Sequence, residues 1–375
     1  MSKITLVSRN FPPLTGGMER LVFELYQNLV RNHNVALLGP GGCNEYVNPT
    51  APVRSTAVSP TLIFLLFTLF KGLFLHRSNN RPDIVIGGSG LVGPIVVALA
   101  KFAGAKTILL LHGLDIIADS RLYQWFFIPL LKQATLLICN STITARLAIA
   151  CGVDEQDIVI VHPGVAVQND VISQLQAKRL QGLEGKSILL SVGRLIPRKG
   201  LAEFIDKTFS KLAAEDPNLI FVIAGTEASS ALNKSGNSVL ANINEAISKH
   251  SLAGQIQLLG YVDDAEVSTL YSAADVFVFP LIETQGDVEG FGMVAIEAAS
   301  HGTPTVAFDC GGVSDAVVNG KNGILVAPGD YAKFGKATLQ LLRSDSRDQA
   351  RDFAGEFSWE NYGIQVERYI EKVLN

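Results

Sequence analysis

Two glutamates stand eight residues apart around a glycine-rich turn. Glu289 lies in the turn of the segment GDVEGFGMVAIEAA, and Glu297 lies in the apolar run that follows it, over which we predict a helix. Each carboxylate can accept a pair of hydroxyl donors, such as those that a sugar or a ribose presents. A glutamate in an alanine-rich helix can also face solvent. The apolar surroundings favour a bound partner, because a buried carboxylate needs one.

Backbone N–H groups at the start of that predicted helix have no partner within the helix. They are therefore available to bind an anion or sugar hydroxyls. They belong to Gly290, Phe291, Gly292, Met293 and Val294.

A second group of residues is basic. Arg194 and Lys199 lie five residues apart in the segment SVGRLIPRKG, across a proline turn between a predicted strand and a predicted helix. Two cations near a helix N-terminus suit a diphosphate, and each charge-assisted hydrogen bond contributes about 1.5–3 kcal/mol. The alternative is a solvated basic loop, which is the usual identity of an isolated basic triplet.

The first half of the chain offers two weaker candidates. Gly16 and Gly17 follow the first predicted strand and open the first predicted helix, where paired glycines let the backbone approach a ligand closely. A plain strand-to-helix turn is the alternative. His112, followed by Gly113, stands at the end of another predicted strand, where it could contact a ligand or be a structural histidine.

Several other chemistries lack their motifs. The chain has neither the GxGxxG fingerprint of dinucleotide-binding domains nor a Walker A loop, and no Asp-x-Asp pair that would hold a metal diphosphate. The four cysteines lack metal-ligand spacing, so we expect reduced structural thiols at Cys43, Cys139, Cys151 and Cys310.

Strands and helices alternate along the chain in two rounds. Short apolar runs predict buried parallel strands at 4–8, 34–38, 83–87, 107–111, 135–139 and 158–161, and again at 187–192, 219–224, 256–259, 276–279, 305–308 and 323–326. Helical spacing separates them, including predicted helices at 91–102 and 121–132. The pattern predicts an α/β protein of two Rossmann-like, doubly wound domains that face a central cleft.

Length and charge agree with two domains. The chain has 375 residues, more than a single core usually supports. We place the domains at residues 1–166 and 167–355, followed by a C-terminal helix, 356–375. Residues 1–168 contain 13 basic and 9 acidic residues, whereas the remainder contains 18 and 26. A basic first half suits an anionic partner such as phosphates or acidic lipids. Nucleic acid is disfavoured, because no basic cluster is interleaved with aromatics.

The mean hydropathy of +0.28 is high for a chain with 18% charged residues. The most apolar stretch runs from Leu62 to Leu75 (LIFLLFTLFKGLFL) and is too short to span a bilayer. With Lys71, Arg77 and Arg81 in or after it, the stretch predicts a helix lying in the interface of an anionic membrane. A core helix is the alternative. The N-terminus has no signal-peptide layout, so we expect a cytoplasmic protein bound peripherally to the inner face of the cell membrane.

Taken together, these motifs resemble the retaining glycosyltransferases of the GT-B fold, family 4. The resemblance rests on Glu289-x7-Glu297, on the stretch from Gly193 and Arg194 to Lys199 and Gly200, and on the two glycine-containing loops of the first half. These motifs occur in the family's order over essentially the whole chain. The segment DVEGFG is also similar to bacterial phosphatidylinositol mannosyltransferases and to lipopolysaccharide and capsule sugar transferases.

The resemblance implies a role for each matching position. Glu297 would hold the ribose, while Glu289 and the amides of residues 291–293 would hold the donor sugar. Arg194 and Lys199 would bind the diphosphate without a metal ion, and Gly17 would close over it from the other domain. His112 would contact the transferred sugar.

The base would lie beside Gly225 and the turn that contains Tyr261 and Val262. The family usually has Gly-x-Gly near Gly225, whereas this chain has Ala224-Gly225-Thr226-Glu227. Base identity therefore stays open. The segment from Ser358 onward would return to the first domain.

The resemblance favours GDP-mannose as donor, with UDP-sugars next, and a lipid-linked glycan as acceptor. A sugar-nucleotide epimerase and a non-catalytic nucleotide-sugar-binding protein are the alternatives. The residues do not indicate an oligomeric state.

Overall fold

The computed structural model describes residues 1–58, 60–77, 81–117, 120, 123–167, 172–227, 238–284 and 286–375. The chain forms two compact units. The N-terminal unit comprises Met1–Gly164 together with Trp359–Asn375, and the C-terminal unit comprises Val165–Ser358. The C-terminal helix therefore belongs to the unit that begins the chain.

The N-terminal unit is built on a seven-stranded parallel sheet in the order β3-β2-β1-β4-β5-β6-β7. Strand β1 lies at the point where the strand order reverses, so that Leu6 pairs with Leu37 on one side and with Ile86 on the other. The strands are β1 (Lys3–Val7), β2 (Asn34–Pro40), β3 (Val53–Thr56), β4 (Ile84–Gly87), β5 (Lys106–Leu111), β6 (Leu136–Cys139) and β7 (Ile158–Ile160).

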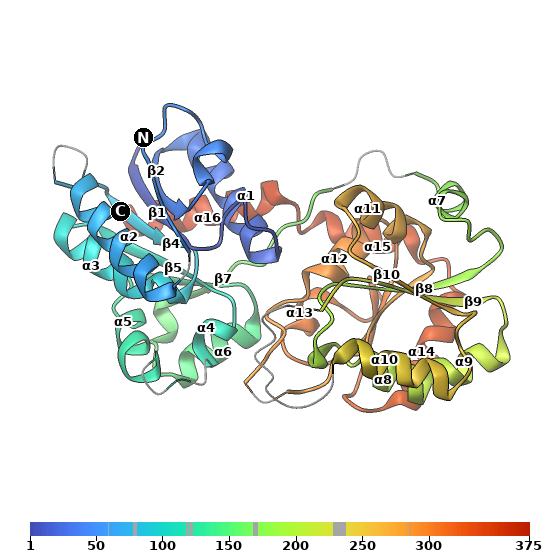
Figure 1. Cartoon of the computed structure of the whole chain (residues 1–375). Helices are drawn as coiled ribbons and strands as arrows, with labels where there is room; N and C mark the ends of the chain where they lie inside the picture. The colour runs from blue at the N-terminus through green and yellow to red at the C-terminus, as the bar shows by residue number, and fades with distance from the viewer. Residues whose placement is uncertain are drawn as a thin grey trace. The chain divides into compact units, whose positions relative to one another are not determined.

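Helices cover this sheet in two groups. Helix α1 packs against the C-terminal helix α16, and His33 after α1 meets Glu367 of α16 at 2.8 Å between Nε2 and Oε1. Helices α2, α3 and α5 lie side by side (Figure 1). The helices are α1 (Gly17–Asn32), α2 (Thr61–Leu75), α3 (Gly93–Ala103), α4 (Leu114–Ile117), α5 (Ile128–Leu131), α6 (Thr142–Ala150) and α16 (Trp359–Leu374).

The C-terminal unit has a six-stranded parallel sheet in the order β10-β9-β8-β11-β12-β13. Its strands are β8 (Ser187–Val192), β9 (Leu219–Ala224), β10 (Ile256–Gly260), β11 (Val276–Phe279), β12 (Thr305–Phe308) and β13 (Gly323–Val326). Its helices are α7 (Gln174–Leu180), α8 (Leu201–Phe204), α9 (Ser210–Glu215), α10 (Val239–Lys249), α11 (Asp264–Ala273), α12 (Met293–Ser300), α13 (Val313–Ala316), α14 (Tyr331–Leu342) and α15 (Arg347–Gly355).

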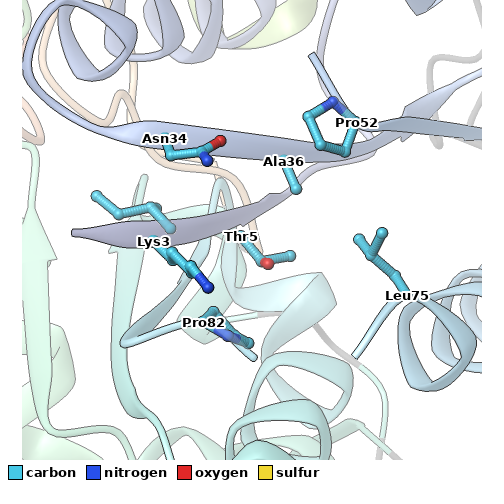
Figure 2. A pocket seen from close by; sticks show the side chains of 8 residues that line it. Lys3, Thr5, Asn34, Ala36, Pro52, Leu75 and Pro82 are labelled. Carbon is cyan, nitrogen blue, oxygen red and sulfur yellow. The ribbon is translucent and has the colours of Figure 1, made fainter. Parts of the chain in front are cut away.

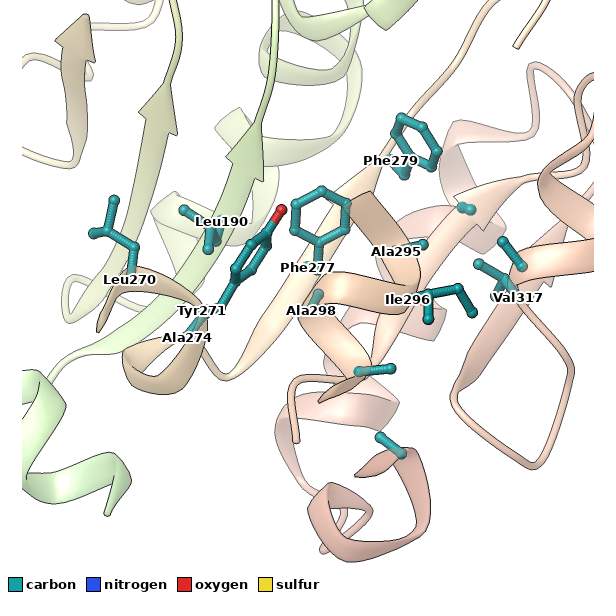
Figure 3. Packing of buried hydrophobic residues seen from close by; sticks show 14 of the residues in the cluster. Leu190, Leu270, Tyr271, Ala274, Phe277, Phe279, Ala295, Ile296, Ala298 and Val317 are labelled. Carbon is teal, nitrogen blue, oxygen red and sulfur yellow. The ribbon is translucent and has the colours of Figure 1, made fainter. Parts of the chain in front are cut away.

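The C-terminal sheet is apolar on both faces because helices cover both. On one face, Phe277 of β11 packs against Tyr271 of α11, with ring centroids 5.9 Å apart, beside Ala295 and Ala298 of α12 (Figure 3). Small alanines allow α12 to approach the sheet closely. This packing holds the start of α12 at the carboxyl end of the strands. The predicted fold class, two doubly wound α/β domains with parallel sheets, is confirmed.

The structure adds to the predictions at two places. Strand β3 was not predicted, because it is a short edge strand that contains Arg54 and lacks an apolar run. The helix predicted over 121–132 is present over residues 123–131, where it begins as a π-helical turn, η3 (Tyr123–Phe127), and continues as the short helix α5. Residues 121 and 122 lie outside the described part of the chain.

Candidate donor-binding site

A buried cluster of opposite charges lies at the carboxyl end of β8. The chain leaves this strand, makes the short 3-10 turn η5 (Pro197–Lys199) and presents Arg198 and Lys199 to the loop before α12. Lys199 Nζ donates to Glu289 Oε2 at 3.3 Å, and the Arg198 guanidinium also donates to this oxygen. Arg198 Nε lies 3.0 Å from Asp287 Oδ2. The structure thus brings together Lys199 and Glu289, which are 90 residues apart in the sequence.

Burial and charge oppose each other in this cluster. Burial raises the pKa of Glu289, but the charges of Lys199 and Arg198 lower it by more than burial raises it. The net shift is downward, so the carboxylate stays ionised. Burial lowers the pKa of Lys199, and the attraction of Glu289 offsets part of that effect. Burial also lowers the pKa of Arg198, whereas Glu289 and Asp287 raise it, and the net shift is upward. Glu289 therefore has a permanent cationic partner in Arg198, and Lys199 can turn toward a ligand without leaving that carboxylate unpaired.

Arg194 differs from the other two cations because its side chain is exposed. Within the described part of the chain, Arg194 takes part in no ion pair. Lys199 makes a cation–π contact, since its Nζ lies 4.4 Å from the centroid of the Phe279 ring. An exposed arginine and a lysine seated on an aromatic ring supply two cations for an anionic group.

Glycines let three loops approach one another at the same edge of the sheet. A Cβ on Gly225 would lie 1.8 Å from the carbonyl oxygen of Gly193, so only glycine fits there. The Gly193 amide donates to Ala224 O at 2.9 Å, and the Gly225 amide donates to Gly260 O at 2.7 Å. The loops after β8, β9 and β10 are therefore joined directly.

Tyr261 and Val262 lie at the same edge, directly after β10. Tyr261, which follows β10, is 81% exposed, and Val262 is half-buried. Glu227, in the segment that departs from the family pattern, accepts hydrogen bonds from Ser238 Oγ at 2.7 Å and from the Leu240 amide at 2.9 Å. Its carboxylate thus stabilises the start of α10.

Gly292 is the N-cap residue of helix α12, and its φ of +97° favours glycine. The Phe291 side chain is buried in the core, and the side chains of Met293 and Val294 are half-buried, so the segment from Gly290 onward offers mainly backbone amides. The Glu289 carbonyl accepts from the Gly312 amide at 2.8 Å. This contact fixes the backbone of the loop that carries Glu289.

Glu297 projects from the second turn of α12 and is partly exposed. Its Oε2 accepts a hydrogen bond from the Tyr271 hydroxyl at 3.2 Å. Tyr271 is 2% exposed and is held in the packed layer of Figure 3. A carboxylate accepts several hydrogen bonds, so Glu297 can also accept hydroxyl donors from a ligand.

The N-terminal unit places its candidates after β1 and after β5, two strands that β4 separates in the sheet. Gly16, with a φ of +152°, and Gly17 open α1 after β1, and a Cβ on Gly16 would lie 2.4 Å from Glu19 Oε2. His112 follows β5, and its Nε2 lies 2.8 Å from the carbonyl oxygen of Gly88, after β4. Because a carbonyl oxygen only accepts, Nε2 carries the proton, which leaves Nδ1 as an acceptor when the ring is neutral.

Sequence reasoning missed several residues that position the candidates. In the sequence, Arg198 belongs to a basic stretch that is typical of a solvated loop, and no motif contains Tyr271. Asp115 fixes the His112 loop, because its Oδ2 accepts from the His112 amide at 3.3 Å and the Gly90 amide at 3.0 Å. An aspartate two residues after His112-Gly113 was the one available hint.

Helix α2 corresponds to the apolar stretch 62–75. Phe64, Thr68 and Gly72 form its buried face, at a spacing of four residues. The opposite face exposes six large apolar side chains, each 44–67% exposed: Leu62, Ile63, Leu66, Phe67, Phe70 and Phe74. Lys71 Nζ is bound to Ser55 O and, at 3.3 Å, to Thr56 Oγ1, whereas Arg77 and Arg81 are exposed. The core-helix alternative accounts for one face of α2 only.

A small pocket lies away from these candidates. It measures about 40 Å³ and lies at the amino ends of β1 and β2, where Lys3, Thr5, Asn34 and Pro52 line it (Figure 2). This volume holds water molecules but no nucleotide sugar. Open α/β sheets bind ligands at the carboxyl ends of their strands, so this pocket is not the donor site.

Neither a metal cluster nor a membrane span is found in the described residues. No three side chains among His, Cys, Asp and Glu converge there as metal ligands would. None of the helices described has both the length and the apolarity that a bilayer-crossing segment requires.

Two family models match the chain, one in each half. Residues 15–169 match the model described as Glycosyltransferase Family 4. Residues 174–356 match the model described as Glycosyl transferases group 1.

Characterised relatives align over almost the full chain. A GDP-mannose-dependent alpha-(1-6)-phosphatidylinositol monomannoside mannosyltransferase of Mycolicibacterium smegmatis is 26% identical over 387 residues, covering 96% of each chain. A glycogen synthase of Mycobacterium tuberculosis is 25% identical over 403 residues, covering 96% of this chain and 92% of the relative. Among solved structures, Anabaena HepE in complex with UDP superposes with a TM-score of 0.80 at 19% identity, covering 99% of this chain and 100% of HepE.

Proposed function

Because the chain belongs to the family 4 glycosyltransferases of the GT-B fold, we propose that it transfers a hexosyl group from a nucleotide-diphosphate sugar to a lipid-linked or glycan acceptor. One observation carries the proposal: the carboxyl edge of the C-terminal sheet combines two cations, Arg194 and Lys199, with Glu289, Glu297 and the backbone amides at the start of α12. These groups match the diphosphate, the sugar and the ribose of such a donor.

The donor that we favour is GDP-mannose, with UDP-sugars as the alternative. The relative from Mycolicibacterium smegmatis is named as GDP-mannose-dependent, whereas HepE was solved with UDP. In either case Glu297, oriented by Tyr271, accepts the ribose hydroxyls. Glu289 and the amides of Phe291, Gly292 and Met293 hold the sugar hydroxyls. The base lies beside Gly225, Tyr261 and Val262.

The proposed chemistry depends on stabilising the departing diphosphate. As the bond between the anomeric carbon and the phosphate oxygen breaks, negative charge grows on the leaving group. Lys199 and Arg194 meet that charge, with no metal ion required. Arg198 keeps Glu289 neutralised while Lys199 binds the phosphate.

In the retaining course that we propose, the acceptor oxygen attacks from the side of the leaving group. Its proton passes to the departing phosphate oxygen. His112 contacts the transferred sugar through the ring edge that carries Nδ1, and Gly16 and Gly17 contribute backbone N–H groups to the diphosphate.

The acceptor site that we propose lies at a membrane surface on the inner face of the cell membrane. The apolar face of α2 and the cations Arg77 and Arg81 beside it match the apolar interface and the anionic headgroups of a bilayer. An enzyme held at this surface meets a lipid-linked acceptor in two dimensions instead of searching the solvent. The product would be a glycolipid or a precursor of a cell-surface polysaccharide such as lipopolysaccharide.

A transfer assay tests this proposal. The purified protein is incubated with radiolabelled GDP-mannose or UDP-sugars, with and without a bacterial lipid extract as acceptor. We expect label in the lipid fraction only when protein, donor and extract are all present. Conversion of the donor to its epimer without extract would support the epimerase instead. Donor binding with no product from any lipid or glycan acceptor would support a non-catalytic binding protein.

A further inference from the structure

An exposed aromatic pair lies on the π-helical turn η3 of the N-terminal unit. Trp125 is 79% exposed and Phe126 is 49% exposed. Their neighbours Tyr123 and Phe127 stack on each other with centroids 4.6 Å apart. Tryptophan is usually well buried in folded proteins, so an exposed aromatic pair favours a contact surface.

The turn is tied to the loop that carries His112. The Tyr123 hydroxyl donates to the Asp115 carbonyl oxygen at 2.8 Å, and Gln124 Nε2 donates to the Ile116 carbonyl oxygen at 2.9 Å. Asp115 in turn binds the His112 amide. Trp125 therefore occupies a defined place next to this loop at the carboxyl edge of the sheet.

The helical layer that contains this turn is continuous with α2. Helix α2 packs on α3, α3 packs on α5, and η3 leads directly into α5 (Figure 1). Helix α2 connects β3 to β4, and η3 with α5 connects β5 to β6. Because these strands are parallel, each connection starts at the carboxyl edge of the sheet and returns the chain to the amino edge.

Charge along this layer is net positive. Between Thr61 and Leu131, the part of the sequence that spans the layer, the chain has six basic and three acidic residues. Exposed apolar side chains next to a basic layer complement the interface of an anionic bilayer, where tryptophan is enriched.

We propose that Trp125 and Phe126 insert into an anionic lipid bilayer as a second contact beside α2. One helix alone would leave the unit free to rotate about the helix axis. Two contacts at the same edge fix its orientation, with the His112 loop facing the lipid. This inference rests on the proposed acceptor site at a membrane surface.

Tryptophan fluorescence can test this contact directly. The chain has two tryptophans, and the other, Trp359, is 9% exposed. Vesicles of phosphatidylcholine with one third phosphatidylglycerol are added to the full-length protein. We expect the emission to shift to shorter wavelength and to be quenched when the phosphatidylcholine carries brominated acyl chains. In Trp125→Phe, which keeps an aromatic ring, neither change should occur.

Sedimentation with the same vesicles separates the two claims. We expect Trp125→Ser/Phe126→Ser to weaken vesicle binding at least about tenfold. Ile364→Ser, which removes a 61% exposed apolar side chain from α16, should have no effect. Binding of the wild type without any change in Trp125 emission would overturn the second contact but leave α2 as the anchor. Absence of binding by the wild type would overturn both the second contact and the proposed membrane site.

Discussion

Replacing Arg198 by methionine tests the charge cluster at the donor site. The Arg198 side chain is 7% exposed, and its partners Glu289 and Asp287 are 16% and 29% exposed. Removing one partner of a buried ion pair costs about 3–5 kcal/mol, because the remaining charge stays buried. Lys199 still neutralises Glu289 in the variant, so we expect the lower end, a loss of about 3 kcal/mol in the free energy of unfolding.

Denaturant titration of the wild type, of the single variants Arg198→Met and Glu289→Gln, and of the double variant measures this loss. The double variant Arg198→Met/Glu289→Gln removes both charges, so it should be more stable than the sum of the two single losses predicts. Arg198→Lys keeps a cation and should lose less than Arg198→Met. A loss below about 1 kcal/mol for Arg198→Met, or strictly additive losses, would refute the coupling of these charges.

Donor binding should weaken in Arg198→Met as well, because Lys199 then becomes the one cation left to Glu289 and is less free to bind phosphate. Isothermal titration with the nucleotide product measures this effect. Affinity equal to the wild type in a folded variant would show that Arg198 does not position the site.

Three further variants probe separate parts of the molecule. Arg194→Ala removes a cation proposed to bind the diphosphate, so turnover should fall severely. Because the side chain is exposed, the melting temperature should change little, and near-normal turnover would remove Arg194 from the site. Phe67→Ser/Phe70→Ser on α2 should weaken binding to anionic vesicles at least about tenfold, and unchanged sedimentation of the folded variant would contradict a role for this face. Burial lowers the pKa of His76 below its ordinary 6.5, so the unfolded state takes up the proton first as pH falls. Stability that His76 contributes above pH 6.5 is therefore lost as pH falls below it, and His76→Gln should flatten melting temperature against pH between 7.5 and 5.5.

The parts of the fold that were predictable are those with a local pattern. Buried parallel strands are apolar on both faces, so β8, β9, β11, β12 and β13 were predicted with the bounds that the structure shows. Edge strand β3 has mixed burial and carries no such pattern.

The gathering of candidate residues at strand ends was also predictable, because doubly wound sheets bind ligands there. Lys199 and Glu289, each identified from its own motif, meet in the structure. Arg198 and Tyr271 escaped prediction for a physical reason. An arginine in a basic turn gives no sign of burial until its carboxylate partners, about 90 residues later in the chain, are placed beside it. Lys71 likewise had no local sign that its amine would bind the carbonyl oxygen of Ser55.

The central claim is that the C-terminal unit binds a nucleotide-diphosphate sugar through Lys199 and the two glutamates. Isothermal titration of the wild type and of Lys199→Met with GDP-mannose, UDP-glucose and the free diphosphates GDP and UDP tests it most directly. One nucleotide series should bind the wild type, and Lys199→Met should lose at least about tenfold in affinity, the value of one charge-assisted hydrogen bond. Failure of every nucleotide to bind, or equal affinity in the folded variant, would contradict the assignment of this site.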